Sequence, residues 1–323
     1  MLTVYEARSG CLQKQTGKPR VTAEAVWIDL LNPTPEEEKK LERALKLNVP
    51  TREEQREIEV SSRLYQEDGV QFMTATVLYQ ADGPQPTTTP VTFILAGSRL
   101  ITLRYAEPRA FALFVSRCNR SETDLSNGSA ILVGLIEAIV DRMADFIERM
   151  QEEVDALSHS IFEVKGGIAT RQRRFDILLR SIGRQGEITS LARESAHSLG
   201  RLLTYFWQAA NARKEGKLLQ GRIRTAARDV TSLADHVTFL SSKIIFLLDA
   251  TLGMVSIQQN DIIKIFSVAA VVFLPPTLIA SIYGMNFNHM PELHWLFGYP
   301  FALGLMVLCA VLPYVYFKRK GWL

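Results

Sequence analysis

Two long uncharged segments near the C-terminal end constrain the fold of this chain more than any other feature. The segment 262–283 contains one charged residue, Lys264, and the segment 295–317 contains none. Because a helix rises about 1.5 Å per residue, each segment is long enough to cross a hydrocarbon layer of about 30 Å. The sequence therefore predicts a transmembrane region over 262–323, with two membrane-spanning helices joined by a polar loop over 284–294.

Charged and aromatic residues predict the orientation of this hairpin. The loop 284–294 holds no Lys or Arg, whereas Lys318, Arg319 and Lys320 directly follow the second segment. Basic residues collect on the cytoplasmic side of a membrane, so we expect both termini in the cytoplasm and the loop outside. Aromatic residues favour the two interfaces, and five of them lie near the predicted ends of the spans: Trp295, Tyr299, Tyr314, Tyr316 and Trp322.

Composition argues against several other classes of protein. The formal net charge of the 323 residues is only +3, and the Arg-rich stretches also contain acidic and apolar residues, so we expect no nucleic-acid partner. Cys11, Cys118 and Cys309 form no CxxC pair, and we predict that they are reduced. The first residues lack the apolar core of a signal peptide. Since the sequence has no P-loop, GxSxG or HExxH motif, we expect neither an enzyme nor a bound cofactor.

The rest of the chain predicts a cytosolic α/β domain followed by long helices, an α+β organisation overall. Residues 1–128 include helices that begin at Pro35 and Pro108. They also include alternating or β-branched segments typical of strands, at 25–30, 63–66, 70–79, 89–95 and 99–104. We expect the last four segments to form an antiparallel sheet. Residues 129–261 predict a cytosolic helical region, and Ser129 is the expected N-cap of its first helix. The apolar positions of that helix recur every three or four residues, which predicts one apolar face: Leu132, Ile136, Ile139, Met143, Ile147, Met150, Val154, Leu157 and Ile161.

The last of these helices predicts a stalk that continues into the membrane. Its apolar positions keep a spacing of three and four residues, typical of a helix packed against other helices. We call these positions the apolar seam: Val230, Leu233, Val237, Leu240, Ile244, Leu247, Thr251 and Met254. No strong helix breaker precedes Pro275. The simplest interpretation is one continuous helix from about Gly221 to Tyr283, on the order of 90 Å long.

A second stripe on the same helix is offset from the apolar seam. We call it the pore stripe: Asp249, Leu252, Ser256, Gln259, Ile263, Phe266, Ala270, Leu274 and Thr277, with Asn260 beside it. Its ends are polar and its middle is apolar. A symmetric bundle of such helices would enclose a narrow channel with a hydrophobic constriction. Ordinary packing between helices is the alternative, and periodicity alone does not choose between the two.

Several segments of the chain resemble the CorA family of divalent-cation transporters. The most specific is Tyr283-Gly284-Met285-Asn286-Phe287 with Met290-Pro291-Glu292-Leu293 after it, at the end of the first predicted span. Other similar segments lie at 260–267, 273–280 and 316–323, and in the N-terminal domain at 25–30, 51–52 and 58–63. The resemblance therefore covers most of the chain.

This resemblance implies a funnel-shaped homopentamer in a bacterial-type inner (plasma) membrane, which carries Mg²⁺, and also Co²⁺ or Ni²⁺, down its electrochemical gradient. Gly284, Met285 and Asn286 would form the selectivity filter. Mg²⁺ sheds water reluctantly, so five Asn286 amide oxygens could hydrogen-bond its water shell without removing it. Glu292 would place negative charge at the outer mouth.

The resemblance also implies a regulatory cation site. Asp249 matches a stalk position where family members place an aspartate for a cation bound between subunits. Mg²⁺ would then be both substrate and regulatory ligand, holding the channel closed. The partner carboxylate stays open among Glu67, Asp68 and Glu107.

Two alternatives stay open. Asn288 stands where the family often has an acidic residue, and the loop carries His289 and His294, so the cargo of the transporter could be a borderline metal such as Zn²⁺. The second alternative is a membrane-anchored signalling or scaffold protein that transports nothing. It predicts no ion flux and no fivefold assembly.

Overall fold

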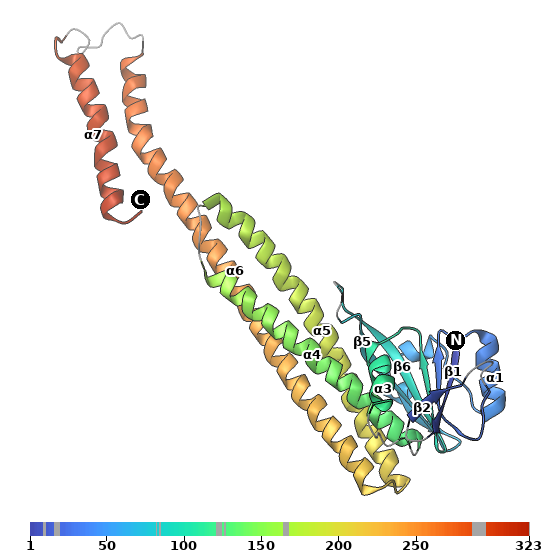
Figure 1. Cartoon of the computed structure of the whole chain (residues 1–323). Coiled ribbons are helices and arrows are strands. Elements are labelled where there is room, and N and C mark those ends of the chain that lie inside the picture. Colours follow the sequence, from blue (N-terminus) through green and yellow to red (C-terminus); the bar gives the residue numbers. More distant parts are fainter. Residues whose placement is uncertain are drawn as a thin grey trace. The chain divides into compact units, whose positions relative to one another are not determined.

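The structure is a computed structural model that describes residues 1–8, 11–15, 20–81, 83, 85–120, 125, 127–163, 168–285 and 295–322. The chain forms two compact units (Figure 1). The first consists of Met1–Phe162 with Arg180–Leu247, and the second of Glu163–Leu179 with Leu248–Leu323.

The first unit contains a seven-stranded sheet in the order β2-β1-β3-β7-β6-β5-β4 within the described residues. The strands are β1 (Leu2–Arg8), β2 (Cys11–Lys14), β3 (Ala25–Leu31), β4 (Leu64–Glu67), β5 (Val70–Tyr79), β6 (Thr87–Ala96) and β7 (Arg99–Arg104). The antiparallel pairing predicted for β4 to β7 is confirmed. Strands β1 and β2, and the parallel pairing of β3 with β7, were not predicted from the sequence.

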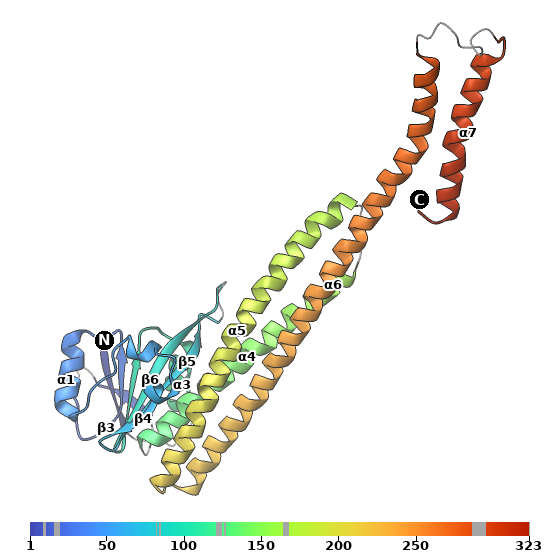
Figure 2. The same ribbon diagram turned by 180° about the vertical axis from the view of Figure 1, so that it is seen from behind.

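Helices cover both faces of this sheet (Figures 1 and 2). Successive residues of a strand point to opposite faces, and Phe93 and Ile94 on β6 accordingly join two separate apolar cores. The core around Ile94 includes Leu41 from α1 (Pro35–Leu45). The core around Phe93 includes Phe114 from α3 (Arg109–Cys118) and the buried face of α4 (Gly128–Phe162). Two short helices, η1 (Glu54–Arg56) and α2 (Val60–Arg63), precede β4.

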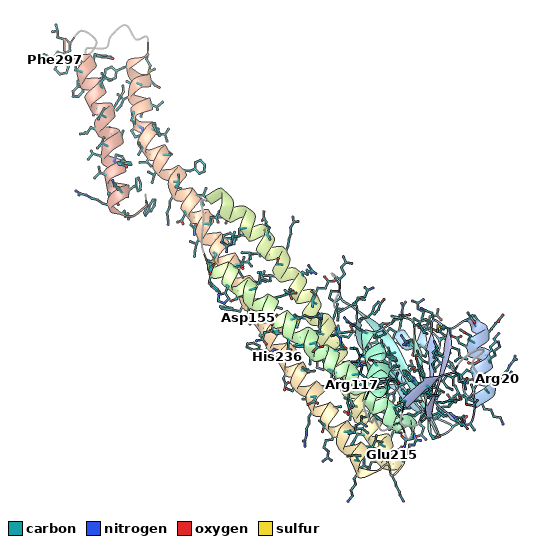
Figure 3. The ribbon with its side chains drawn as sticks, viewed as in Figure 1. Arg20, Arg117, Asp155, Glu215, His236 and Phe297 are labelled. Carbon is teal, nitrogen blue, oxygen red and sulfur yellow. The ribbon has the colours of Figure 1, made fainter. Side chains whose placement is uncertain are left out.

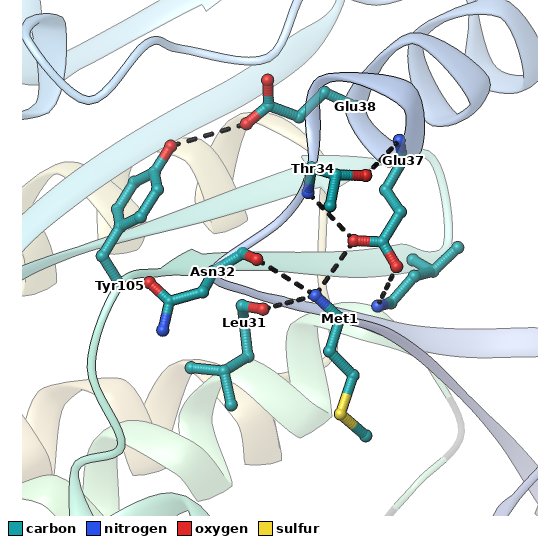
Figure 4. Close-up of polar contacts among 8 residues, drawn as sticks. Met1, Leu31, Asn32, Thr34, Glu37, Glu38 and Tyr105 are labelled. Carbon is teal, nitrogen blue, oxygen red and sulfur yellow. Dashed lines mark hydrogen bonds and ion pairs between the residues drawn. The ribbon is translucent and has the colours of Figure 1, made fainter.

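The start of α1 is tied to β1 through one carboxylate (Figure 4). The Thr34 hydroxyl accepts from the Glu37 N–H at 3.3 Å, and the Glu37 carboxylate accepts from the Thr34 N–H at 3.0 Å. The same carboxylate accepts from the Leu2 N–H at 3.0 Å and lies 2.9 Å from the Met1 ammonium. Burial raises the pKa of Glu37, but these hydrogen bonds outweigh it and hold the pKa below its usual value.

A buried polar network joins the parallel strands β3 and β7. The Arg104 guanidinium donates to both oxygens of Asp29, at 3.0 and 2.7 Å, and the Thr102 hydroxyl donates to the same carboxylate at 2.7 Å. Trp27 completes the network by donating its indole N–H to Thr102 at 3.0 Å. Asp29 is 4% exposed and Arg104 8%, so losing one partner would leave the other as an uncompensated buried charge.

Three long helices complete the first unit: α4, α5 (Ile168–Ala212) and α6 (Lys217–Tyr283), the last two extending into the second unit. All nine apolar positions predicted to face inward on α4 are buried: Leu132, Ile136, Ile139, Met143, Ile147, Met150, Val154, Leu157 and Ile161. Polar pairs at a nearly constant sequence offset show that α4 and α6 run parallel and in register: Glu137 with Arg222, Gln151 with His236, and Asp155 with Lys243. Figure 3 labels Asp155 on α4 and His236 on α6. The predicted continuous helix to Tyr283 is confirmed, and it begins at Lys217.

The prediction that Ser129 caps α4 is wrong. The Asn127 side chain accepts from the Ala130 N–H at 2.8 Å, and the Ser129 hydroxyl instead donates to Glu215 at 2.9 Å. The reason is the contact between α4 and β7. A Cβ on Gly128 would lie 2.4 Å from the backbone of Arg99, so glycine allows a close approach here, and the helix begins two residues earlier than a cap at Ser129 would give.

The second unit holds the two segments predicted to cross a membrane. They are the last part of α6 and α7 (Gly298–Arg319). Both helices are long and apolar enough to span a bilayer, and only 6% of the most apolar window of each is buried. α7 begins three residues later than the predicted start at Trp295 and extends to Arg319.

We predict that Asp29→Ala destabilises the first unit by about 3–5 kcal/mol, because it leaves Arg104 buried and unpaired. Asp141→Ala is the matched control. Its partner Arg117 lies 2.8 Å away, but both side chains are more than half exposed, and such pairs contribute about 0–1 kcal/mol. The measurement is the urea midpoint of tryptophan fluorescence for the detergent-solubilised protein. Equal shifts in the two variants would contradict the assigned role of the buried network.

Candidate ion pathway

The pore stripe lies on an exposed face of α6. All nine of its residues are exposed in the single chain: Asp249, Leu252, Ser256, Gln259, Ile263, Phe266, Ala270, Leu274 and Thr277. By contrast, the apolar seam on the same helix is buried at Val237, Leu247 and Thr251. Within the described residues, the pore stripe therefore does not pack against other helices of its own chain. Other faces of α6 beyond Leu252 are exposed as well, so the polar residues, rather than exposure, distinguish this stripe.

The chemical character of the pore stripe changes along the helix. Asp249 and Gln259, together with the neighbouring Asn260, offer carboxylate and amide oxygens at one end. Ile263 and Phe266 follow and are 61% and 72% exposed. Oxygen atoms suit a hydrated divalent cation, whereas large apolar side chains in a narrow passage exclude both water and ions.

The helix continues through two prolines in its membrane-spanning part. Proline has no N–H, so the carbonyl oxygens of Val271 and Val272 lack the donors that Pro275 and Pro276 would otherwise supply. The carbonyl groups that this Pro-Pro pair releases were not predicted from the sequence, in which Pro275 was considered only as a helix breaker. Such groups are tolerated at membrane depth where they face protein or a water-filled cavity.

Thr277 follows these prolines on the pore stripe. Its hydroxyl donates to the Phe273 carbonyl at 2.7 Å. A hydroxyl that donates in this way still has lone pairs with which to accept a hydrogen bond. The water shell of a cation can supply that donor, so Thr277 suits contact with a hydrated ion.

The first span ends at the predicted selectivity filter. The Gly284 N–H donates to the Ala280 carbonyl at 2.9 Å and the Met285 N–H to the Ile282 carbonyl at 3.3 Å, which closes the last turn after Tyr283. Met285 is 48% exposed, and a thioether is a poor ligand for a hard cation.

The other loop residues singled out from the sequence lie outside the described residues. They are the filter residue Asn286, the mouth residue Glu292, and Asn288, His289 and His294. The candidate filter is thus described only as far as Met285.

Asp249, the predicted regulatory ligand, is exposed and belongs to the second unit. Its candidate partners Glu67, Asp68 and Glu107 are also exposed, and they belong to the first unit. The described residues contain no group of three or more His, Cys, Asp or Glu side chains able to hold a metal ion.

Comparisons with known proteins extend over almost the whole sequence. The family model described as CorA-like Mg²⁺ transporter protein matches residues 22–319. The chain is 38% identical over 300 residues to a magnesium transport protein CorA of Pectobacterium atrosepticum, covering 93% of this chain and 92% of that protein. It is 35% identical over 324 residues to the magnesium transport protein CorA of Escherichia coli K12, covering 100% of both.

A solved structure shows the same fold. The complete structure of the CorA magnesium transporter from Methanocaldococcus jannaschii has a TM-score of 0.71 to this chain at 16% identity, covering 100% of this chain and 99% of that one. The similarity therefore includes the soluble unit, the long helix and the two candidate spans.

Proposed function

Because this chain belongs to the CorA family of Mg²⁺ transporters, we propose that it is a membrane channel that carries Mg²⁺ into the cell. The main support is the family match over residues 22–319 combined with the position of Gly284-Met285-Asn286, directly after α6 ends at Tyr283. A membrane potential that is negative inside lowers the free energy of an entering cation by about 2.3 kcal/mol per charge per 100 mV. For a divalent cation this free-energy gain is doubled. The channel then needs no other energy source.

The proposed assembly is a homopentamer with both termini in the cytoplasm. Lys318, Arg319 and Lys320 after α7, and the absence of basic residues from the loop 284–294, support this orientation. Five copies of α6 would line the pore, because α6 carries both the pore stripe and the residues that lead into the filter. The five copies of α7 would form the outer ring against lipid.

Selection in this channel depends on Asn286. Five amide oxygens at the end of the first span hydrogen-bond the water shell of Mg²⁺, which avoids most of the cost of dehydration. Glu292 raises the local cation concentration at the outer mouth. Thr277 accepts from the same water shell further along, and Asn260 does so at the cytosolic mouth.

Gating depends on the apolar part of the pore stripe. Rings of Ile263 and Phe266 close the passage by excluding water when the α6 helices approach one another. Asp249 regulates this approach, because a cytosolic Mg²⁺ bound between carboxylates of neighbouring subunits removes their mutual repulsion. When that Mg²⁺ dissociates, the subunits move apart, water fills the apolar part of the pore, and the channel conducts.

We expect Asn286→Ala to abolish selective Mg²⁺ uptake into proteoliposomes while the oligomer stays intact, because the apolar seam that packs α6 is unchanged. Asn288→Ala, two residues along the same loop, is the matched control and keeps its uptake. Co²⁺ and Zn²⁺ serve as competitors, with and without a pH gradient. Normal selective uptake by Asn286→Ala would refute the filter assignment, and stronger competition by Zn²⁺ than by Co²⁺ would favour zinc transport.

Asp249→Ala should weaken the inhibition of flux by internal Mg²⁺, since it removes one carboxylate from each regulatory site. Asp235→Ala is the control, because Asp235 is exposed on the same helix but lies outside the pore stripe. The measurement is uptake of tracer cation at a series of internal Mg²⁺ concentrations. Unchanged inhibition in the Asp249 variant would count against the regulatory site.

Native mass spectrometry of the purified protein should show five copies of the chain. A pore on a symmetry axis requires a closed ring, whereas a membrane-anchored scaffold has no such need. A monomer or dimer with no ion flux would favour the scaffold.

A further inference from the structure

A cavity of about 530 Å³ lies in the first unit and is lined by the end of β5 and by residues of α3, α4 and α5. Apolar side chains from three of these elements form part of its wall: Val77, Ala110, Ile139 and Met143. Its volume falls in the range of small-molecule binding sites, which are mostly apolar with a few converging polar groups. None of its lining residues belongs to the candidate ion pathway.

Ser195 lines one side of the cavity, and its buried hydroxyl group has no hydrogen-bond partner among the described residues. The residue is only 1% exposed. Other hydroxyls on α5, those of Thr189, Ser190 and Thr204, donate to the carbonyl four residues earlier. Buried polar groups are nearly always paired, so the unpaired hydroxyl of Ser195 is an exception at the edge of the cavity.

The N-terminus of α3 also borders the cavity. Its N-cap is Pro108, which provides no side-chain hydrogen bond, and the next residues Arg109 and Ala110 line the cavity. The N–H of Ala110 stands at a helix position for which no acceptor exists inside the helix. The first turn of a helix carries a partial positive charge, which favours an anion.

Two guanidinium groups contribute further positive charge. Arg109 and Arg142 line the cavity, together with one acidic residue, Glu107, among the described lining residues. Arg142 donates to Asp145 at 2.9 Å, and because Asp145 is 57% exposed and lies outside the lining, this ion pair is weak. A guanidinium binds phosphate oxygens through two parallel hydrogen bonds.

We propose that this cavity binds a small organic phosphate monoester. Its phosphate lies at the N-terminus of α3 within reach of Arg109 and Arg142, and its apolar body contacts Ile139 and Met143. One oxygen of the same phosphate ester also accepts from the Ser195 hydroxyl. Phosphate suits the site better than carboxylate, because its three terminal oxygens can accept from the helix N-terminus and from both guanidinium groups at once.

The test is isothermal titration of the full-length protein in detergent with phenyl phosphate, and with inorganic phosphate for comparison. We expect one saturable site per chain, with phenyl phosphate bound about tenfold or more tightly than inorganic phosphate, because its ring buries apolar surface. Arg109→Met and Arg142→Met should each weaken binding about tenfold. Arg117→Met is the matched control at the other end of α3 (Figure 3), and it should bind like the wild type.

Ser195→Ala gives a second, conservative test. It removes an unsatisfied buried hydroxyl, so the variant should unfold at a higher temperature without ligand and yet bind phenyl phosphate about fivefold more weakly. The proposal is overturned if phenyl phosphate shows no saturable binding, or if Arg109→Met and Arg142→Met bind it like the wild type. Equal affinity for inorganic and phenyl phosphate would also overturn it, because that result means an adventitious anion at surface arginines only.

Discussion

The structure depends on one helix that changes its surroundings along its length. In the first part of α6, the apolar seam is buried against other helices, and α4 runs beside it in register. Beyond Thr251, which is fully buried, most residues of the helix are exposed. A continuous helix tolerates both surroundings, because each backbone group is paired within the helix, whether its neighbour is protein or lipid.

The position of the chemically useful residues follows from this change. Residues of the apolar seam are already used in packing within the chain, so only the exposed positions of α6 are available to contact another subunit, lipid or an ion. The pore stripe combines Asp249 and Gln259 with Ile263 and Phe266 on such positions. A single chain supplies one oxygen-bearing side chain at each level, which is too few to surround a hydrated divalent cation. The proposed ring of identical subunits multiplies each of them around one axis.

The sequence predicted those parts of the structure in which local periodicity and composition decide the outcome. The spacing of Leu132 to Ile161 on α4 and of the apolar seam on α6 identified buried faces, because side chains three and four residues apart share one side of a helix. Strands β4 to β7 were found because their alternating or β-branched residues are typical of strands, and they pair in the order in which they follow one another in the chain. The filter sequence Gly284-Met285-Asn286 was recognised from the sequence alone, whereas its geometry stays a prediction.

The residues by themselves therefore determined three features. Hydropathy identified the two candidate spans, the helical period identified the continuous stalk helix, and a specific motif identified the family, because each of these signals is a local property of the chain. Tertiary structure decided what depends on contacts between distant segments. The pairing of β3 with β7 joins residues 73 positions apart, and the buried Asp29–Arg104 pair joins residues 75 positions apart. The start of α4 at Gly128 follows from the approach of β7, and the cavity around Ser195 needs four separate elements. No local pattern encodes such contacts, because burial and unpaired polar groups exist only after the elements have packed.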